Sequence, residues 1–294
     1  MKQMNTASPQ RHWDMRAAGN FIGGGTGSGL VVAAALAAAL PGAHAVPTAA
    51  VVAGMLFVMA GLSLVWLEIG KPWRALNVFF HPQTSWMTRE AILAGPLIAC
   101  SAAAAWWRDP ALLALAALLA AGFMYCQARM LRASKAIPAW SHPRVVPLLL
   151  ATALAEGTGA FLLLGGADST AMVALALLAT LAREAAREAY RRALVASDAP
   201  AGTLQWFARR ETRVLQALRV LAALAMLAAL LGIGGPWLAA VGGTIAALTG
   251  WALKAILVTR AAYTRGARIP HAPARGRGEA SSVLPFAAPA KRPR

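Results

Sequence analysis

Long apolar runs alternate with shorter polar segments along most of this chain. The runs span residues 21–40, 46–67, 91–107, 111–128, 145–167, 169–182, 214–231 and 237–258. A helix of about 20 residues crosses a bilayer core of about 30 Å. The pattern therefore predicts an all-α fold, a polytopic membrane protein with an eight-helix transmembrane bundle. The helical pattern of the sixth run continues as REAAREAYRR, where Glu184/Arg187 and Glu188/Arg192 fall at the spacing of helical ion pairs. We expect this part to project beyond the lipid as a solvated extension.

Composition supports this class and suggests the chain's organisation. Hydrophobic residues make up 59% of the 294 residues and charged residues only 13%, whereas a soluble domain carries about 25% charged residues. We predict a cytoplasmic N-terminal segment over residues 1–17 and the transmembrane bundle over 18–260. Residues 261–294 are rich in Arg, Pro, Gly and Ala, which predicts a disordered basic tail.

The basic residues indicate how the bundle is oriented. Eight crossings place both termini on one side, and that side receives 27 of the 28 Lys and Arg residues, leaving only Arg108 on the other. Positively charged loops stay in the cytoplasm. We therefore expect both termini to be cytoplasmic and the protein to lie in the inner (cytoplasmic) membrane. The net charge of +17 then indicates membrane orientation, with no nucleic acid as a partner.

The first apolar run has an alternative interpretation. The sequence Ala43-His44-Ala45 resembles a signal-peptidase site, and its cleavage would leave seven crossings. The run before it has about 20 residues, longer than the 7–15 residues of a typical signal core. We therefore keep it as a membrane span.

Cysteine and histidine positions argue against a resident metal centre. The only cysteines, Cys100 and Cys126, both lie inside apolar runs. An iron–sulfur cluster or Cys-based zinc site needs about four ligands. The five histidines all lie outside the runs, so a haem held between helices has no axial pair. We predict no haem and no metal in this chain.

A glycine-rich stretch opens the first span, at residues 23–29. It lacks the Lys-Ser/Thr ending and the preceding strand of a nucleotide-binding loop. Small residues in a membrane helix allow neighbouring helices to approach closely. Close packing is the expected role, and a groove for a flat ligand is the alternative.

Glu156 lies in the middle of the fifth run. A charge at that depth costs about 2.5–3.5 kcal/mol on insertion scales. It therefore needs either a structural hydrogen bond between helices or a role in proton transfer or ligand binding. The sequence leaves both open.

Charged and aromatic residues that could form a reactive site are densest between the second and third runs, at residues 66–96. Carboxylates, cations and aromatic rings alternate there. A loop that only connects two helices does not require so many of these side chains. A carboxylate beside a quinone ring can supply or accept its protons, cations can stabilise charge on the reduced ring, and aromatic side chains can hold it. The candidate catalytic residues are Glu90, Glu68 and Glu156, and the candidate quinone-binding residues are Lys71, Trp73, Arg74, Trp86 and Arg89.

The same stretch carries a family resemblance. Residues 68–77 (EIGKPWRALN), 85–90 (SWMTRE) and 136–140 (AIPAW) resemble the membrane anchor subunits of DMSO-reductase-type molybdoenzymes, which include polysulfide-reductase-like anchors. The eight apolar runs and the absence of haem ligands agree with this family, so the resemblance covers about residues 18–260. The opening residues 13–21 (WDMRAAGNF) more narrowly resemble anchors of phenylacetyl-CoA:acceptor oxidoreductases.

The resemblance implies a complex of three subunits. A molybdopterin catalytic subunit would handle the substrate, a four-cluster iron–sulfur subunit would carry electrons, and the anchor would exchange them with menaquinone or ubiquinone in the membrane. The family links a glutamate that follows a serine in the second motif to quinol binding, and Glu90 matches it. Glu68 stands where the family commonly has a histidine, a departure that leaves its role open.

Two rival functions remain. A proton-coupled small-solute transporter would use Glu156 as its coupling carboxylate. A pure scaffold would anchor partner subunits without touching quinone.

Overall fold

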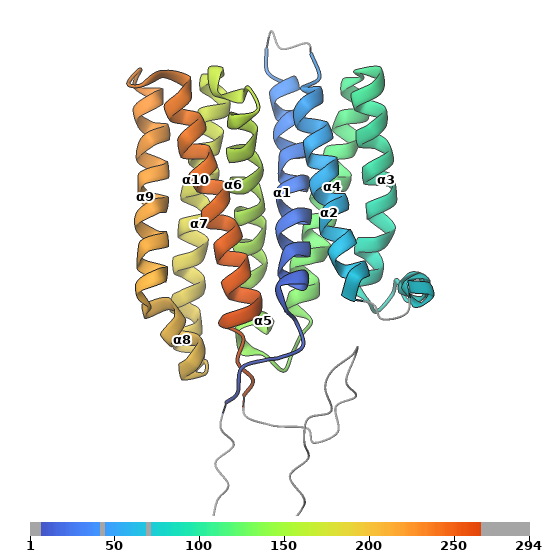
Figure 1. Ribbon diagram of the computed structural model, residues 1–294, viewed down its shortest axis with the longest axis vertical. Helices are drawn as coiled ribbons and strands as arrows, with labels where there is room; N and C mark the ends of the chain where they lie inside the picture. Colours follow the sequence, from blue (N-terminus) through green and yellow to red (C-terminus); the bar gives the residue numbers. More distant parts are fainter. Residues whose placement is uncertain (1–6, 42–44, 69–71, 266–294) are drawn as a thin grey trace, which may run out of the picture.

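The structure is a computed structural model that describes residues 7–41, 45–68 and 72–265. These residues form eight long helices that lie side by side in one bundle (Figure 1). The long helices are α1 (Met15–Ala38), α2 (Thr48–Glu68), α3 (Trp86–Trp107), α4 (Pro110–Arg132), α6 (Val145–Leu163), α7 (Thr170–Ala196), α9 (Arg210–Leu230) and α10 (Gly235–Ala255). The short ones are η1 (Pro72–Phe80), α5 (Pro138–Ser141), η2 (Gly166–Asp168), α8 (Ala201–Ala208) and η3 (Ile256–Arg260).

The all-α prediction is confirmed, and the chain has the architecture of a multi-pass membrane protein. Among the described residues, seven helices are long and apolar enough to cross a membrane. The remaining long helix, α7, is the most charged, with the sequence REAAREAYRR in its second half. The predicted eight crossings are therefore not established by length and composition.

Polar residues just before the apolar runs start several helices. Asp14 caps α1 by accepting from the Arg16 backbone N–H at 2.7 Å. Ser85 caps α3 through the Thr88 N–H at 3.2 Å, and Asp109 and Ser169 cap α4 and α7 in the same way. Such caps satisfy backbone donors that have no partner inside the helix.

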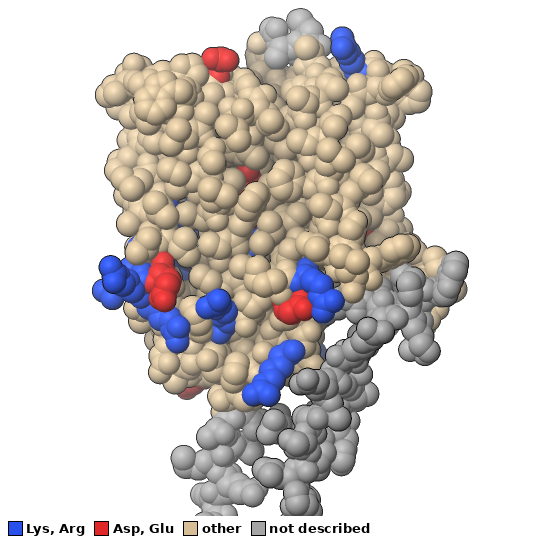
Figure 2. All heavy atoms as spheres, in the orientation of Figure 1, with Lys and Arg blue, Asp and Glu red and all other residues tan. Residues whose placement is uncertain are grey.

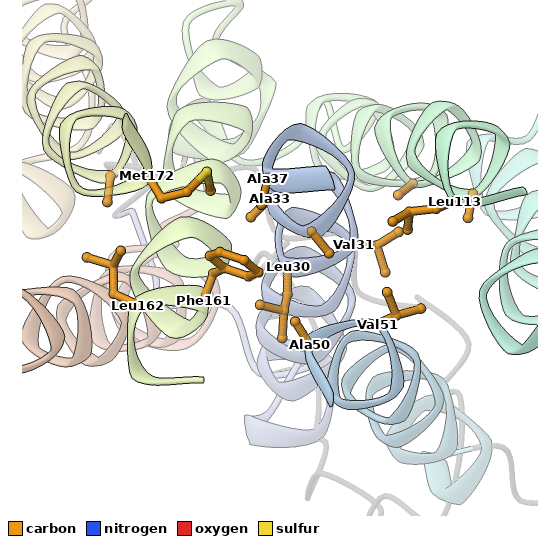
Figure 3. Close-up of a cluster of buried hydrophobic side chains, with 14 of the residues drawn as sticks. Leu30, Val31, Ala33, Ala37, Ala50, Val51, Leu113, Phe161, Leu162 and Met172 are labelled. Carbon is orange, nitrogen blue, oxygen red and sulfur yellow. The ribbon is translucent and has the colours of Figure 1, made fainter. Parts of the chain in front are cut away.

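Helix α1 lies at the centre of the bundle, between a group formed with α2, α3 and α4 and a group of α6, α7, α9 and α10 (Figure 1). It packs against α2 and α4 on one side and against α6 and α10 on the other. Figure 3 shows the apolar core around it, where Leu30 and Val31 meet Val51, Leu113 and Phe161.

The glycine-rich stretch makes these contacts close, as predicted. A Cβ atom on Gly23 or Gly27 would collide with the backbone of α2, at Gly61 and Gly54. A Cβ on Gly29 would collide with the backbone of α6 at Ala153, and Gly157 of α6 lies against the backbone of Gly29. Helices therefore touch backbone to backbone on two sides of α1.

The two ends of the bundle differ strongly in charge. Successive long helices are antiparallel. As a result, all described Lys and Arg residues except Arg108 lie toward the end that carries η1, α5 and α8. Figure 2 shows Lys and Arg gathered around this lower end of the visible face. We call it the basic end.

The segment before α1 is held at the basic end by the chain that follows α10. Pro9 forms an isolated antiparallel bridge with Tyr263, and the Gln10 N–H donates to the Ala262 carbonyl at 2.8 Å. Trp13 stacks on Trp140 of α5, with ring centroids 4.9 Å apart. Two of the motifs that carry the resemblance, residues 13–21 and 136–140, thus pack against each other.

The second half of α7 corrects one expectation. The ion pairs expected at helical spacing are present, Arg187–Glu184 at 3.0 Å and Arg192–Glu188 at 2.8 Å. The segment as a whole was expected to be a solvated extension, but Arg183 and Tyr190 are buried in it. That expectation was wrong, because this half of α7 turns one face toward α9 and α10.

Replacement of Gly157 by Ala tests the close contact between α1 and α6. The added Cβ would meet the Gly29 and Leu30 backbone, which cannot move aside as a flexible side chain would. We expect a loss of about 1–3 kcal/mol in stability, measured by thermal unfolding of the purified chain in detergent. Gly95→Ala in α3 is the control, because its Cβ would meet nothing within 4 Å. Equal unfolding temperatures for the two variants would contradict the packing argument.

Candidate functional site

The predicted quinone site falls at the basic end, where α2 ends and α3 begins. Lys71 lies outside the described residues, and so do the side chains of Glu68, Trp73 and Arg74. The structure therefore places three of the predicted residues of this stretch with their side chains: Trp86, Arg89 and Glu90.

Glu90 is buried between α1, α3 and α4, with 3% of its surface exposed. Its Oε1 accepts from Gln127 Nε2 at 3.0 Å and from Asn20 Nδ2 at 3.4 Å. Gln127 Nε2 also donates to the Asn20 carbonyl at 3.1 Å. The described hydrogen-bond partners of this carboxyl group are thus amides, and no cation forms an ion pair with it among the described residues.

Trp86 and Arg89 lie on the same turn of α3 as Glu90 and contact two residues of α4. The guanidinium carbons of Arg89 and Arg129 lie 4.2 and 4.4 Å from the Trp86 ring centroid. Tyr125 packs edge-on against Trp86, at 5.8 Å between centroids, and its hydroxyl accepts from Arg129 Nη1 at 2.7 Å. We call Trp86, Arg89, Tyr125 and Arg129 the arginine–tryptophan cluster.

Arg89 also shapes the loop before α3. Its Nε donates to the Pro82 carbonyl at 2.7 Å and its Nη2 to the Gln83 carbonyl at 2.8 Å. The cluster is half-exposed at the bundle surface, whereas Glu90 is enclosed. An accessible aromatic and cationic surface thus stands directly beside a buried carboxyl group.

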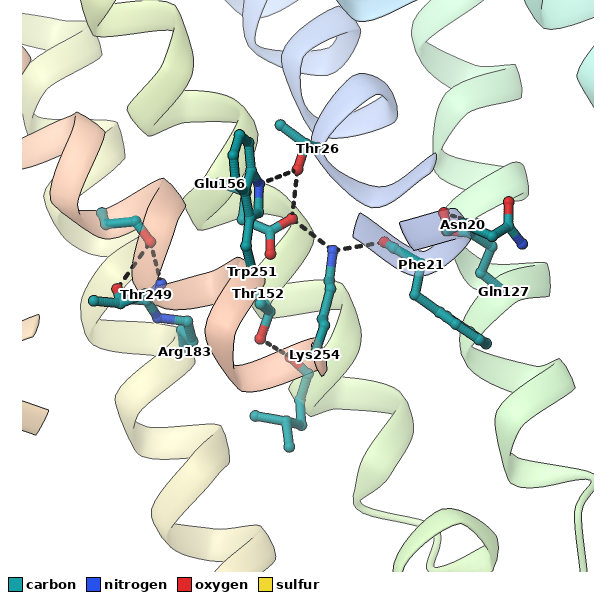
Figure 4. A network of polar contacts seen from close by, with 12 residues as sticks. Asn20, Phe21, Thr26, Gln127, Thr152, Glu156, Arg183, Thr249, Trp251 and Lys254 are labelled. Carbon is teal, nitrogen blue, oxygen red and sulfur yellow. Dashed lines mark hydrogen bonds and ion pairs between the residues drawn. The ribbon is translucent and has the colours of Figure 1, made fainter. Parts of the chain in front are cut away.

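Glu156 lies elsewhere, in the centre of the bundle, and forms an ion pair with Lys254 of α10. Lys254 Nζ is 2.5 Å from Glu156 Oε2 and also donates to the Phe21 carbonyl at 2.9 Å. The hydroxyl of Thr26 donates to the same carboxylate oxygen at 2.9 Å and accepts from Trp251 Nε1 at 2.8 Å. Figure 4 shows these contacts converging between α1, α6 and α10.

Both side chains of this pair are fully enclosed. Lys254 is 2% exposed and Glu156 is 0% exposed. The ammonium group lies beside Gly25, where a side chain would fill its place, and Glu156 packs against Gly250. Glu156 Oε1 has no hydrogen-bond partner among the described residues. The structure therefore shows a hydrogen bond between helices, one of the two possibilities left open for Glu156, and adds an ion pair.

Glu90 and Glu156 do not touch, but their partners share a small cavity. It has a volume of about 10 Å³ and is lined by Gln127 and Lys254 together with Phe21 and Gly25. That volume approaches the minimum that holds one water molecule. A polar route from Glu90 through Gln127 and Lys254 to Glu156 thus has a single narrow gap.

The sequence interpretation missed the partners of both carboxyl groups. Lys254 is the only charged residue in the last apolar run, and Glu156 is the only one in the fifth. Two lone opposite charges in apolar runs are a signal for a buried pair, because each alone is costly in lipid. The sequence indicates Asn20 and Gln127 as partners of Glu90 less clearly, because neutral amides are common at helix ends.

Among the described residues, no three His, Cys, Asp or Glu side chains group closely enough to hold a metal ion. No protein-family model matches the chain, and a search of curated proteins finds no match.

Replacement of Lys254 by Met tests the buried pair. Removal of one partner leaves the other charge enclosed, which costs about 3–5 kcal/mol. We expect that loss in thermal unfolding in detergent, and recovery of most of it in the Glu156→Gln/Lys254→Met double variant. Arg192→Met is the matched control, since Arg192 pairs with Glu188 while 76% exposed and such pairs contribute about 0–1 kcal/mol. If Lys254→Met unfolded like this control, the pair would have no structural role.

Proposed function

We propose that this chain is the integral-membrane anchor of a molybdopterin and iron–sulfur oxidoreductase, which exchanges electrons between a docked iron–sulfur subunit and the quinone pool. The observation that carries the proposal is the buried Glu90 next to the arginine–tryptophan cluster. It lies in a stretch whose sequence resembles such anchors.

The site provides the groups that a quinone requires from a protein. The Trp86 and Tyr125 rings offer flat apolar surfaces, and Arg89 and Arg129 place positive charge beside them. Reduction of a quinone consumes protons and oxidation of a quinol releases them. Glu90, enclosed and hydrogen-bonded to amides, is the group that holds and passes on such a proton.

The basic end supplies a surface for the iron–sulfur subunit. The connections at that end include η1, α5 and α8, whereas the opposite end has η2 and tight turns. On η1, the Phe79 and Phe80 side chains are 47% and 68% exposed. A large connecting surface with exposed rings is suited to a protein partner. We propose that the four-cluster iron–sulfur subunit docks here and that the molybdopterin subunit attaches through it.

The same proposal sets the topology. We propose that α7 is the eighth crossing, with Arg183 and Arg187 turned into the bundle, and that both termini face the cytoplasm in the inner membrane. The concentration of the described basic residues, all but Arg108, toward one end supports this orientation, because basic loops resist translocation.

The Glu90→Gln variant tests the proton role. Gln keeps the size of the side chain but cannot take up the proton, so we expect quinone-linked electron flow to fall by about 10²–10⁴-fold. The measurement is turnover with a soluble quinone analogue in membranes that contain the assembled complex.

The control is Glu188→Gln, which removes a carboxylate on the surface of α7 that pairs with Arg191 and Arg192. Its turnover should match the parent, and both variants should retain parental amounts of the partner subunits. Unchanged turnover in Glu90→Gln would remove Glu90 from the mechanism.

One observation favours a second candidate, a proton-coupled transporter. The enclosed Glu156–Lys254 pair lies beside a cavity in the centre of the bundle, where coupling carboxylates of transporters lie. Protonation of Glu156 would release Lys254 and couple a proton to a change in helix packing.

Mild detergent purification separates the two functions. We expect the native chain to co-purify molybdenum and iron, measured by elemental analysis, because the anchor is part of a complex. Recovery of the chain alone, with proton-dependent solute uptake after reconstitution, would favour the transporter and overturn the anchor.

A further inference from the structure

A second pocket lies at the basic end, away from Glu90, between α7, α8, α9 and η3. Its enclosed volume is about 30 Å³, and it is walled mainly by apolar and aromatic side chains that include Tyr190, Trp206 and Phe207. Two arginines, Arg187 of α7 and Arg219 of α9, also line it. Neither the quinone site nor the Glu156–Lys254 pair uses this pocket.

The arginines beside the pocket outnumber their partner. Arg219, Arg187 and Arg183 all approach the single carboxylate of Glu184, at 2.6, 3.0 and 3.6 Å. Their side chains are only 2%, 8% and 1% exposed. One carboxylate leaves an excess of two positive charges in this enclosed cluster.

Two of these guanidinium groups also have nitrogens without a hydrogen-bond acceptor among the described residues. Nη2 of Arg219 and Nη2 of Arg183 are buried and have no partner among the described residues. Arg183 uses its Nη1 to donate to the Ala246 carbonyl at 2.6 Å. Buried charged donors are normally paired, because an unpaired one loses its hydration without compensation. The arrangement is therefore suited to an added oxyanion at Arg219, which lines the pocket and whose Nη2 has no acceptor among the described residues.

Two further arginines lie against Trp206, which lines the pocket. Arg209 stacks over the Trp206 ring at 3.9 Å, and Arg260 lies 5.6 Å from the same ring. Beyond it, the outer face of α9 is apolar and exposed, with Val220, Leu221 and Leu224 each more than half exposed. A cationic pocket thus opens beside a surface suited to acyl chains.

We propose that this pocket binds the phosphate of an anionic phospholipid from the leaflet at the basic end. Arg219 and Arg187 donate charge-assisted hydrogen bonds to the phosphate oxygens, and Arg209 lies at the rim. The acyl chains run along the exposed apolar face of α9. Basic pockets between membrane helices bind lipid head groups in this way. The site does not depend on the redox role.

The test uses the full-length chain purified in mild detergent. Phosphatidylglycerol, phosphatidylcholine and inorganic phosphate are titrated separately, and the midpoint of thermal unfolding is followed. We expect phosphatidylglycerol alone to raise the midpoint, and lipid extraction to recover about one anionic phospholipid per chain. An equal rise with inorganic phosphate would contradict the proposal that the phosphate comes from a lipid. An equal rise with phosphatidylcholine would contradict the proposal that the pocket recognises the negative charge.

Variants at the rim and wall locate the site. Arg187→Gln and Arg209→Gln should each weaken phosphatidylglycerol binding by about tenfold, the loss expected for one charge-assisted hydrogen bond. Arg192→Gln is the matched control on α7, since Arg192 is 76% exposed and does not line the pocket. Arg209→Gln, close to the surface, keeps the test valid if Arg187→Gln fails to fold. Parental binding in Arg209→Gln and in any folded Arg187→Gln would overturn the proposal.

Discussion

The close contact of α1 with the helices around it determines where the partners of Glu90 and Glu156 can lie. Gly23, Gly27 and Gly29 bring the α2 and α6 backbones against α1. The intervening Gly24 and Gly25 leave room for the side-chain ends of Gln127 and Lys254. In lipid, polar groups must be satisfied inside the protein. One glycine-rich stretch of α1 therefore both joins the two groups of helices and accommodates the partners of Glu90 and Glu156.

Those two carboxyl groups are held in chemically different ways. Glu156 faces an ammonium group and a hydroxyl, so its charge is compensated within the bundle. Glu90 faces two neutral amides, which orient it without neutralising it. A group of the second kind responds more readily to a change of charge nearby, as when a quinone accepts or releases electrons. This difference is why the proposed proton chemistry is assigned to Glu90 and a structural role to the Glu156–Lys254 pair.

Positive charge at the basic end contributes to contacts within the bundle as well as to the proposed membrane orientation. Arg89 and Arg129 hold the Trp86 ring, whereas Arg183, Arg187 and Arg219 are drawn into the bundle around one glutamate. A buried arginine excess is unfavourable unless an anion compensates it, and the phosphate of the proposed lipid would be that anion. The two halves of the bundle thus use arginine differently, the first half beside an aromatic surface and the second beside an enclosed pocket.

The sequence by itself determined the class of fold, because a run of about 20 apolar residues is stable in lipid only as a helix. It also predicted that residues 23–29 pack closely and that Glu156 needs a partner, since both follow from local composition. The partners themselves, Lys254 for Glu156 and Gln127 with Asn20 for Glu90, were decided by the tertiary structure. They lie 98, 37 and 70 residues away along the chain, and no local pattern encodes which helices become neighbours. The inward turn of Arg183 and Arg187 has the same origin: a charged helix end is solvated unless neighbouring helices cover it, and here α9 and α10 do.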